Sequence, residues 1–215
     1  MDRRKERDKS MKVISSVAAL SLLCGAAHAG NLLRNGNFEA NPPPSGCAGN
    51  LTVLQGWTVV QGAVDVESAV PNCSQVTAAG SGTHWIDLTG SSENTNATIR
   101  QDVRTIVGRT YLLTFYVGAN AEWQPGCFFS GYSNDGSVKS MTVFVNGKVG
   151  SSGEVGIYAN YSMDTTGQAC TSANWTLEGL QFTATENTTE ITFHSNDSSG
   201  VYGPLLDGVF LRLLP

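Results

Sequence analysis

The sequence has little charge. Asp, Glu, Lys and Arg make up 14% of its 215 residues, whereas about a quarter is usual in soluble globular domains. Basic residues become scarce after residue 29, because residues 30–215 keep only seven of the 13 Lys and Arg but 15 of the 18 Asp and Glu. A protein that binds nucleic acid needs a basic surface, so we do not expect nucleic acid as a partner.

Helical periodicity is missing as well. No window of a dozen residues places apolar side chains at helical spacing. Short segments instead alternate apolar and polar residues, as strands do, and turn-forming residues separate them about every 8–12 positions. This spacing is typical of a β-sandwich. Because no long linker, charge block or internal repeat divides residues 30–215, we expect one all-β domain over that range.

Four segments carry the clearest strand patterns. Residues 110–118 are largely apolar on both faces, which is typical of a central strand. The stretch "SMTVFV" alternates with three apolar side chains inward before the Asn146-Gly147 pair, a strong hairpin signal. In "TEITFHS", Ile191 and Phe193 are predicted inward, and the phase shift at Gly179 in "WTLEGLQFTAT" predicts a bulge.

The apolar run of residues 13–23 is too short to cross a bilayer. It follows the basic stretch "MDRRKERDKSMK" and precedes Ala27-His28-Ala29, a small-x-small cleavage pattern. These features are typical of a secretory signal peptide. We therefore expect residues 1–29 to be removed and the mature chain to be secreted, in the extracellular space or the periplasm, without membrane contact.

Cysteine pairs at zinc-binding spacing are absent. No C-x-x-C occurs, and neither His84 nor His194 lies near a cysteine in the sequence, which disfavours a zinc site. The four cysteines beyond residue 29 allow two disulfides in three connectivities. Because closing a short loop costs less entropy, we favour Cys47–Cys73 and Cys127–Cys170.

Catalytic motifs are also absent. No G-x-S-x-G or H-E-x-x-H pattern occurs, and both histidines stand alone in strand-like segments. Glycoside hydrolysis needs two carboxylates on either side of one bond. Glu122 and Asp135 share one loop, but their spacing alone does not establish such a pair, so we expect no enzymatic activity.

Similar apolar segments open and close the mature chain. "NLLRNGNFE" carries Glu39, and "GPLLDGVFL" carries Asp207. If these segments pair as antiparallel strands, the two carboxylates come together and repel, unless one is protonated or a positive charge intervenes. Calcium accepts such oxygens; hydrogen bonds from backbone amides or a contact with Arg212 are the alternative.

The opening "NLLRNGNFE", the Gly-Trp of "LQGWTVV" and the closing "GPLLDGV" together resemble the galactose-binding-like β-sandwiches. The chain is most similar there to the secreted family called domain of unknown function 642. This resemblance implies a jelly-roll fold and non-catalytic binding of cell-wall or other extracellular polysaccharide. It also implies a structural calcium at Glu39 and Asp207.

Sugar binding requires exposed aromatic rings with hydrogen-bonding neighbours. We expect them in two loops that a Cys127–Cys170 bond would join, and Trp57, Trp85 and Trp175 in the core. The loop aromatics could instead form a small core around the disulfide, and the protein could instead be an extracellular structural or adhesion protein that binds a protein partner. The candidate sugar-binding residues are Trp123, Phe128, Phe129, Tyr132, Tyr158 and Tyr161.

Overall fold

The computed structural model describes residues 30–40, 46–80, 82–91, 96–127, 136–146, 156–197 and 200–215. Within these ranges the chain forms eleven β-strands and no helix. No helix that could span a membrane occurs among the described residues. The prediction of an all-β fold is therefore confirmed.

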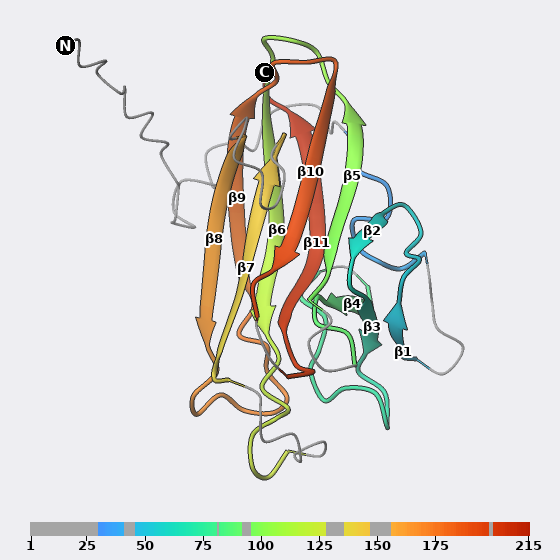
Figure 1. Cartoon of the computed structure of the whole chain (residues 1–215), viewed down its shortest axis with the longest axis vertical. Coiled ribbons are helices and arrows are strands. Elements are labelled where there is room, and N and C mark those ends of the chain that lie inside the picture. Colours follow the sequence, from blue (N-terminus) through green and yellow to red (C-terminus); the bar gives the residue numbers. More distant parts are fainter. Residues whose placement is uncertain are drawn as a thin grey trace, which may run out of the picture.

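The strands form two antiparallel sheets that face each other, as Figure 1 shows. One sheet has six strands in the order β1-β3-β4-β11-β6-β9, which are β1 (Ala48–Leu51), β3 (Val64–Ser68), β4 (His84–Asp87), β11 (Pro204–Leu213), β6 (Thr110–Ala119) and β9 (Thr176–Thr183). The other has five in the order β2-β5-β10-β7-β8, which are β2 (Thr58–Gln61), β5 (Thr98–Arg104), β10 (Thr188–Ser195), β7 (Val138–Val145) and β8 (Ile157–Asp164). The architecture is a jelly-roll β-sandwich.

The main core lies between the two sheets. Phe115 of β6 meets Phe193 of β10 edge-to-face, with ring centroids 5.2 Å apart, and Trp57 packs against the same Phe193. The inward residues predicted for β7 and β10 are all buried there, as are alternate residues of β6. The alternation of apolar and polar residues therefore predicted the inward faces of these strands correctly.

A smaller apolar cluster lies outside the main core. It joins Val76, Trp85, Ala173 and Leu205, and half-buried Trp175 packs against it. Trp57 and Trp85 are buried as predicted. The long connection between β3 and β4 thus supplies Val76 to cover part of the six-stranded sheet.

The first segment lies beside the last strand, but it is not a strand. The Leu32 amide donates to the Leu211 carbonyl, and the Val209 amide donates to the Gly36 carbonyl, so the two segments run in opposite directions. Asn35 and Phe38 have φ angles of 51° and 57°, which coil the segment into turns. The predicted adjacency is confirmed, and the predicted strand over residues 31–39 is wrong.

The bulge lies elsewhere than predicted. β6 and β9 pair without interruption past Gly179, which stands opposite Thr114. The other ladder of β6 is irregular instead, because the register shifts in β11 between Asp207 and Phe210, where Gly208 has a φ angle of 57°. A left-handed glycine is a recurrent way to build a bulge, whereas Gly179 fits a regular ladder.

Both favoured disulfides are present. Cys47 pairs with Cys73 and Cys127 with Cys170, and the Cα atoms of each pair lie 5.5 Å apart. The first bond ties the β3–β4 connection to the segment before β1, and the second joins the loops that follow β6 and β8. Two disulfides fit a protein of an oxidising compartment.

Candidate functional site

The outer face of the five-stranded sheet carries a continuous row of side chains. The register places one residue from each strand side by side, so that the row crosses the whole sheet. In Figure 1 this sheet lies in front, from β8 on the left to β5 and β2 on the right. The row consists of Thr58, Arg100, Thr192, Phe144 and Tyr158.

Two aromatic rings occupy the β7–β8 end of this row. Phe144 and Tyr158 are cross-strand partners, with ring centroids 6.2 Å apart and planes tilted by 35°. Phe144 is half-buried, and Tyr158 is 48% exposed. Cross-strand aromatic pairs stabilise a sheet, but a buried sheet face would not leave a tyrosine this exposed. The pair forms an accessible aromatic surface.

Hydroxyl, amide and imidazole groups continue the face in the next row. The Thr142 hydroxyl donates to Asn160 Oδ1 at 2.6 Å and accepts from Asn196 Nδ2 at 2.9 Å. His194 Nδ1 lies 2.8 Å from Thr98 Oγ1. Burial lowers the pKa of His194, so its ring is neutral at neutral pH and keeps both a donor and an acceptor.

One ion pair involves Arg100 of the first row. Arg100 Nη1 lies 3.0 Å from Glu190 Oε2, and the Thr192 hydroxyl donates to the other oxygen of Glu190. Asn146, just after β7, also holds β10 in place, because its Oδ1 accepts a hydrogen bond from the Glu190 amide. Such a half-exposed pair contributes at most about 1 kcal/mol to stability, so its main effect is to orient the arginine.

Tyr158 and Tyr161 lie on a strand and not in the expected loop. They belong to β8, and because they are three positions apart they face opposite sides of the sheet. Tyr161 packs inward, edge-to-face on Phe115 at 5.3 Å. Its hydroxyl is buried and has no hydrogen-bond partner among the described residues. Burial, together with the charge of Glu178, raises its pKa to about 12.

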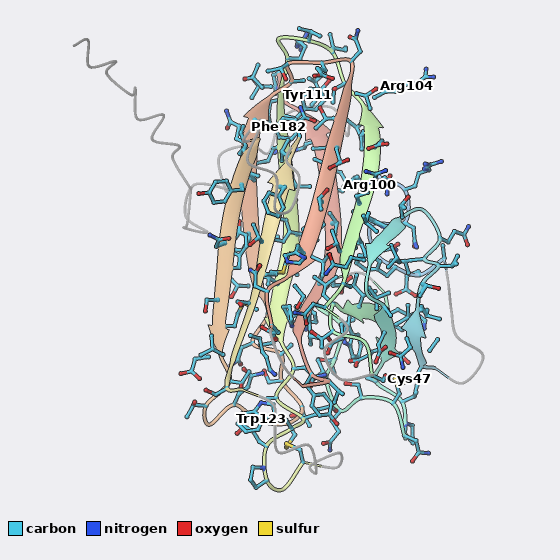
Figure 2. All side chains as sticks on the ribbon, in the orientation of Figure 1. Cys47, Arg100, Arg104, Tyr111, Trp123 and Phe182 are labelled. Atoms are coloured by element: carbon cyan, nitrogen blue, oxygen red, sulfur yellow. A yellow bond between two sulfur atoms is a disulfide. The ribbon has the colours of Figure 1, made fainter. Side chains whose placement is uncertain are left out.

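Trp123 lies at the lower end of the sandwich, opposite the end where Tyr111 and Phe182 stack (Figure 2). Its indole N–H donates to the hydroxyl of Thr165, just past the end of β8. Tyr158 precedes Thr165 by seven residues of mostly extended chain, roughly 20 Å. The structure therefore does not bring Trp123 and Tyr158 together. Phe128, Phe129 and Tyr132 lie outside the described residues.

Glu39 and Asp207 hold the two ends of one glycine-rich loop. Glu39 Oε1 accepts from the amides of Thr83 and His84, both at 2.7 Å, and its Oε2 lies 2.7 Å from His84 Nδ1. Asp207 Oδ2 accepts from the amides of Ala79 and Gly80. The carboxylates from the two chain ends thus anchor the connection into β4.

The pKa values of the two carboxyl groups are shifted in opposite directions. Partial burial alone would raise the pKa of Glu39, but hydrogen bonds from His84 and from the Thr83 amide outweigh it, and the pKa is lowered. Burial raises the pKa of Asp207 despite its amide hydrogen bonds, and the nearby charge of Glu39 adds to the rise. The charge of Glu39 therefore acts on Asp207, as expected from the adjacency of the chain ends.

This arrangement does not fit calcium. A calcium site supplies six to eight oxygen ligands, whereas amide N–H groups and the His84 ring surround the carboxylates of Glu39 and Asp207. No group of three or more His, Cys, Asp and Glu that could hold a metal occurs in the described part of the chain. Of the two expectations, amide hydrogen bonds are found, and Arg212 makes no ion pair with either carboxylate among these residues.

The carboxylate of Glu122 is used in hydrogen bonds that hold the structure together. It is almost fully buried, and its carboxylate accepts from the Gln75 amide and the Ser74 hydroxyl. Asp135, the other carboxylate considered for glycoside hydrolysis, lies outside the described residues. The expectation that the protein has no enzymatic activity stays a prediction.

Sequence reasoning overlooked most of the sheet face. Residues 157–164 alternate in character: Ala159, Tyr161 and Met163 face inward, and Asn160 and Ser162 face outward. That period of two predicts a strand and an outward Tyr158. The same alternation in β7 places Phe144 outward, so the cross-strand neighbour was within reach of the pattern, but the register that pairs them was not.

Proteins similar to this chain are found among solved structures and among family models. The comparison with curated proteins finds no match. Solved structures with a similar chain trace include TmCBM61, solved in complex with β-1,4-galactotriose (16% identity, 86% of this chain and 100% of that chain, TM-score 0.48). They also include CBM4 (12%, 85% and 99%, 0.46) and the K1 cleaved adhesin domain of Lys-gingipain from Porphyromonas gingivalis W83 (11%, 79% and 98%, 0.49).

The family comparison covers nearly all of the sandwich. The model described as "Protein of unknown function (DUF642)" matches residues 31–212. This range begins at the segment docked on β11 and ends within β11 itself. It includes the opening and closing segments on which the resemblance was recognised. The chain belongs to the DUF642 family.

Proposed function

We propose that this protein is secreted and binds extracellular polysaccharide through the outer face of the five-stranded sheet, without chemistry on the glycan. The observation that carries this proposal is the accessible Phe144–Tyr158 pair beside a hydrogen-bonded polar row. The signal-like sequence of residues 1–29 and the two disulfides support secretion.

The face has the chemistry that a sugar chain requires. A pyranose presents C–H groups on its ring faces, which pack on aromatic rings, and hydroxyls at its rim, which need donors and acceptors. Phe144 and Tyr158 offer the first, and Asn160 and His194 offer the second. Five strands about 4.8 Å apart span roughly 19 Å, which suits an oligosaccharide better than a single sugar.

A binding role fits the state of Glu190, the carboxylate paired with Arg100 on this face. Glu190 is engaged by Arg100 and by the Thr192 hydroxyl. A general acid or base needs a carboxyl free to exchange a proton with the substrate. We therefore assign Glu190 to the orientation of Arg100 and not to acid–base chemistry.

Co-sedimentation with insoluble polysaccharides, and affinity electrophoresis with soluble ones, test the proposal. Tyr158→Ala and Phe144→Ala should each weaken binding about tenfold, the effect of losing roughly 1.4 kcal/mol of aromatic contact. Trp123→Ala is the matched control, because it removes an aromatic side chain at the far end of the molecule. Equal binding by wild type and both sheet variants, with loss in Trp123→Ala, would move the site to the loops.

A protein partner is the second candidate function. Ile106 and Val107, in the connection between β5 and β6, are 57% and 54% exposed, and Arg104 and Arg109 flank them in the sequence. Exposed apolar residues with arginine neighbours are common at protein interfaces. If Ile106→Ser abolishes the binding of a protein partner and Tyr158→Ala does not, the result would favour protein binding over glycan binding.

A further inference from the structure

A cavity opens on the other side of the sandwich, on the outer face of the six-stranded sheet. Its volume is about 560 Å³, within the range of about 300–1,000 Å³ common for small-ligand sites. It lies between the segment that follows residue 30 and the bulge of β11. Its lining includes Asn31, Asn35, Asn37, Tyr116, Gly208 and Phe210.

Two half-exposed aromatic side chains form part of the wall. Tyr116 stands opposite Asp207 in the ladder, and a Cβ added to Gly208 would lie 2.9 Å from Tyr116 Cδ2. The tyrosine ring therefore lies directly over a residue without a side chain. The bulge then turns Phe210 to the same outer face, since Val209 and Leu211 point into the core.

Hydrogen bonds to the backbone hold the cavity walls in place. Asn31 Nδ2 donates to the Val209 carbonyl at 2.8 Å, and Asn31 Oδ1 accepts from the Leu211 amide at 2.9 Å. The Val209 amide donates to the Gly36 carbonyl at 2.7 Å. On the other side, Asp207 holds the amides of Ala79 and Gly80. A cavity with such fixed walls is preformed, which lowers the entropic cost of binding.

The lining selects against charged ligands. All eleven lining residues are uncharged, and Asp207 beneath them is buried with its oxygens occupied by amides. Asn37 is exposed and lines the cavity, and its side-chain amide can donate and accept at once. Aromatic rings with a few amides and no ion suit a neutral polyhydroxylated ring.

We propose that this cavity is a second glycan-binding site, which takes one neutral sugar unit with Tyr116 and Phe210 against its ring and Asn37 at its hydroxyls. The site goes beyond the proposed function, because it lies on the opposite sheet from Phe144 and Tyr158. With both sites occupied, one molecule holds two glycan chains and links them.

Amide NMR with neutral oligosaccharides of glucose, galactose, mannose and xylose as probes tests the proposal. We expect at least one probe to shift the amides of residues 31–37, 79–80 and 208–210 in the wild type. Tyr116→Ala should abolish these shifts and leave those of β7 and β8 unchanged, whereas Tyr116→Phe should keep both. Tyr158→Ala is the matched variant and should remove only the β7 and β8 shifts.

The outcomes separate the two proposals. Shifts on β7 and β8 but none at the cavity with any of the four probes would overturn the second site and leave the proposed function standing. Shifts at the cavity alone would support the second site and contradict the sheet face. A cavity response to galacturonate oligomers but to none of the neutral probes would overturn the assignment to a neutral sugar. Unchanged far-UV and near-UV circular dichroism shows that each variant is folded.

Discussion

At the scale of single residues, the acidic side chains of this weakly charged chain act as anchors for loops. Carboxylates accept backbone amide hydrogens at the ends of several connections, which satisfies donors that irregular chain would otherwise bury unpaired. The anchoring carboxylates and the residues whose amides they bind are Asp65 with Asn50 and Ser91, Asp87 with Thr89 and Gly203, and Glu122 with Gln75, together with Glu39 and Asp207.

Two of the buried acidic side chains, Glu67 and Asp87, lower the stability of the folded state at neutral pH. Burial raises the pKa of Glu67 well above its ordinary value of 4.5, and the charges of Asp87, Glu122 and Asp65 add to the rise, against a hydrogen bond from Trp85. Burial also raises the pKa of Asp87. Above pH 4.5 the folded state therefore keeps protons that the unfolded state has lost. The free energy of unfolding falls as pH rises through that window and levels off above the raised pKa.

Glu67→Gln should remove part of this pH dependence. Glutamine keeps an oxygen that can accept from the Trp85 indole, whose N–H lies 2.9 Å from Glu67 Oε2, but it has no proton to lose. A carboxyl that titrates only in the unfolded state changes stability by about 1.4 kcal/mol per pH unit. Thermal melts from pH 4 to pH 8 should show a flatter decline for the variant than for the wild type.

The control for this experiment is Glu186→Gln, at an exposed position, which should leave the pH profile of the melting temperature unchanged. Parallel profiles for Glu67→Gln and the wild type would show that Glu67 ionises in the folded state as readily as in the unfolded state. That result would contradict the burial argument.

Calcium should not stabilise the protein. A ligand bound only by the folded state raises the melting temperature, but the oxygens of Glu39 and Asp207 already accept amide hydrogens. We expect equal melting temperatures in millimolar calcium and in excess EDTA. A calcium-dependent rise that Asp207→Asn abolishes would restore the ion that the family resemblance implies.

At the scale of elements, the contact between the first segment and β11 closes one side of the sandwich. Gly36 touches β11 so closely that an added Cβ would overlap the carbonyl oxygen of Val209. Phe38 continues from there into the main core, with its ring centroid 6.0 Å from that of Trp57. The docking of this segment thus depends on one residue without a side chain.

Gly36→Ala should destabilise the fold by about 2–3 kcal/mol, since forcing a methyl group into a filled contact moves backbone. Urea denaturation followed by tryptophan fluorescence measures the loss. Gly136→Ala is the matched control, because nothing lies within 4 Å of a Cβ there. Equal stability of the two variants would mean that the first segment is not held against β11 as the structure shows.

Sequence patterns were informative for elements with a period of two and failed where register or turns decide. The inward residues of β7 and β10 followed from alternation alone. The coil of residues 31–40 did not, because positive φ at Asn35 and Phe38 has only a weak sequence signal. Phe144 and Tyr158 are 14 positions apart, and only the pairing of β7 with β8 makes them neighbours.

At the scale of the whole molecule, the two sheets bury one shared core and leave two different outer faces. The outer face of the five-stranded sheet is broad and polar, with the Phe144–Tyr158 pair near one edge. The other outer face is partly covered by the β3–β4 connection and contains the cavity at Tyr116. The strand pattern and the family resemblance predicted the sandwich. The face that carries side chains suited to a ligand became visible only with the strand register.

A crystal structure of the protein with a bound neutral oligosaccharide tests the central claim most directly. The account predicts sugar rings packed against Phe144 and Tyr158, with hydroxyls in hydrogen-bond contact with Asn160 or His194. Sugar bound only at the end of the molecule that carries Trp123, with the five-stranded sheet bare, would contradict it.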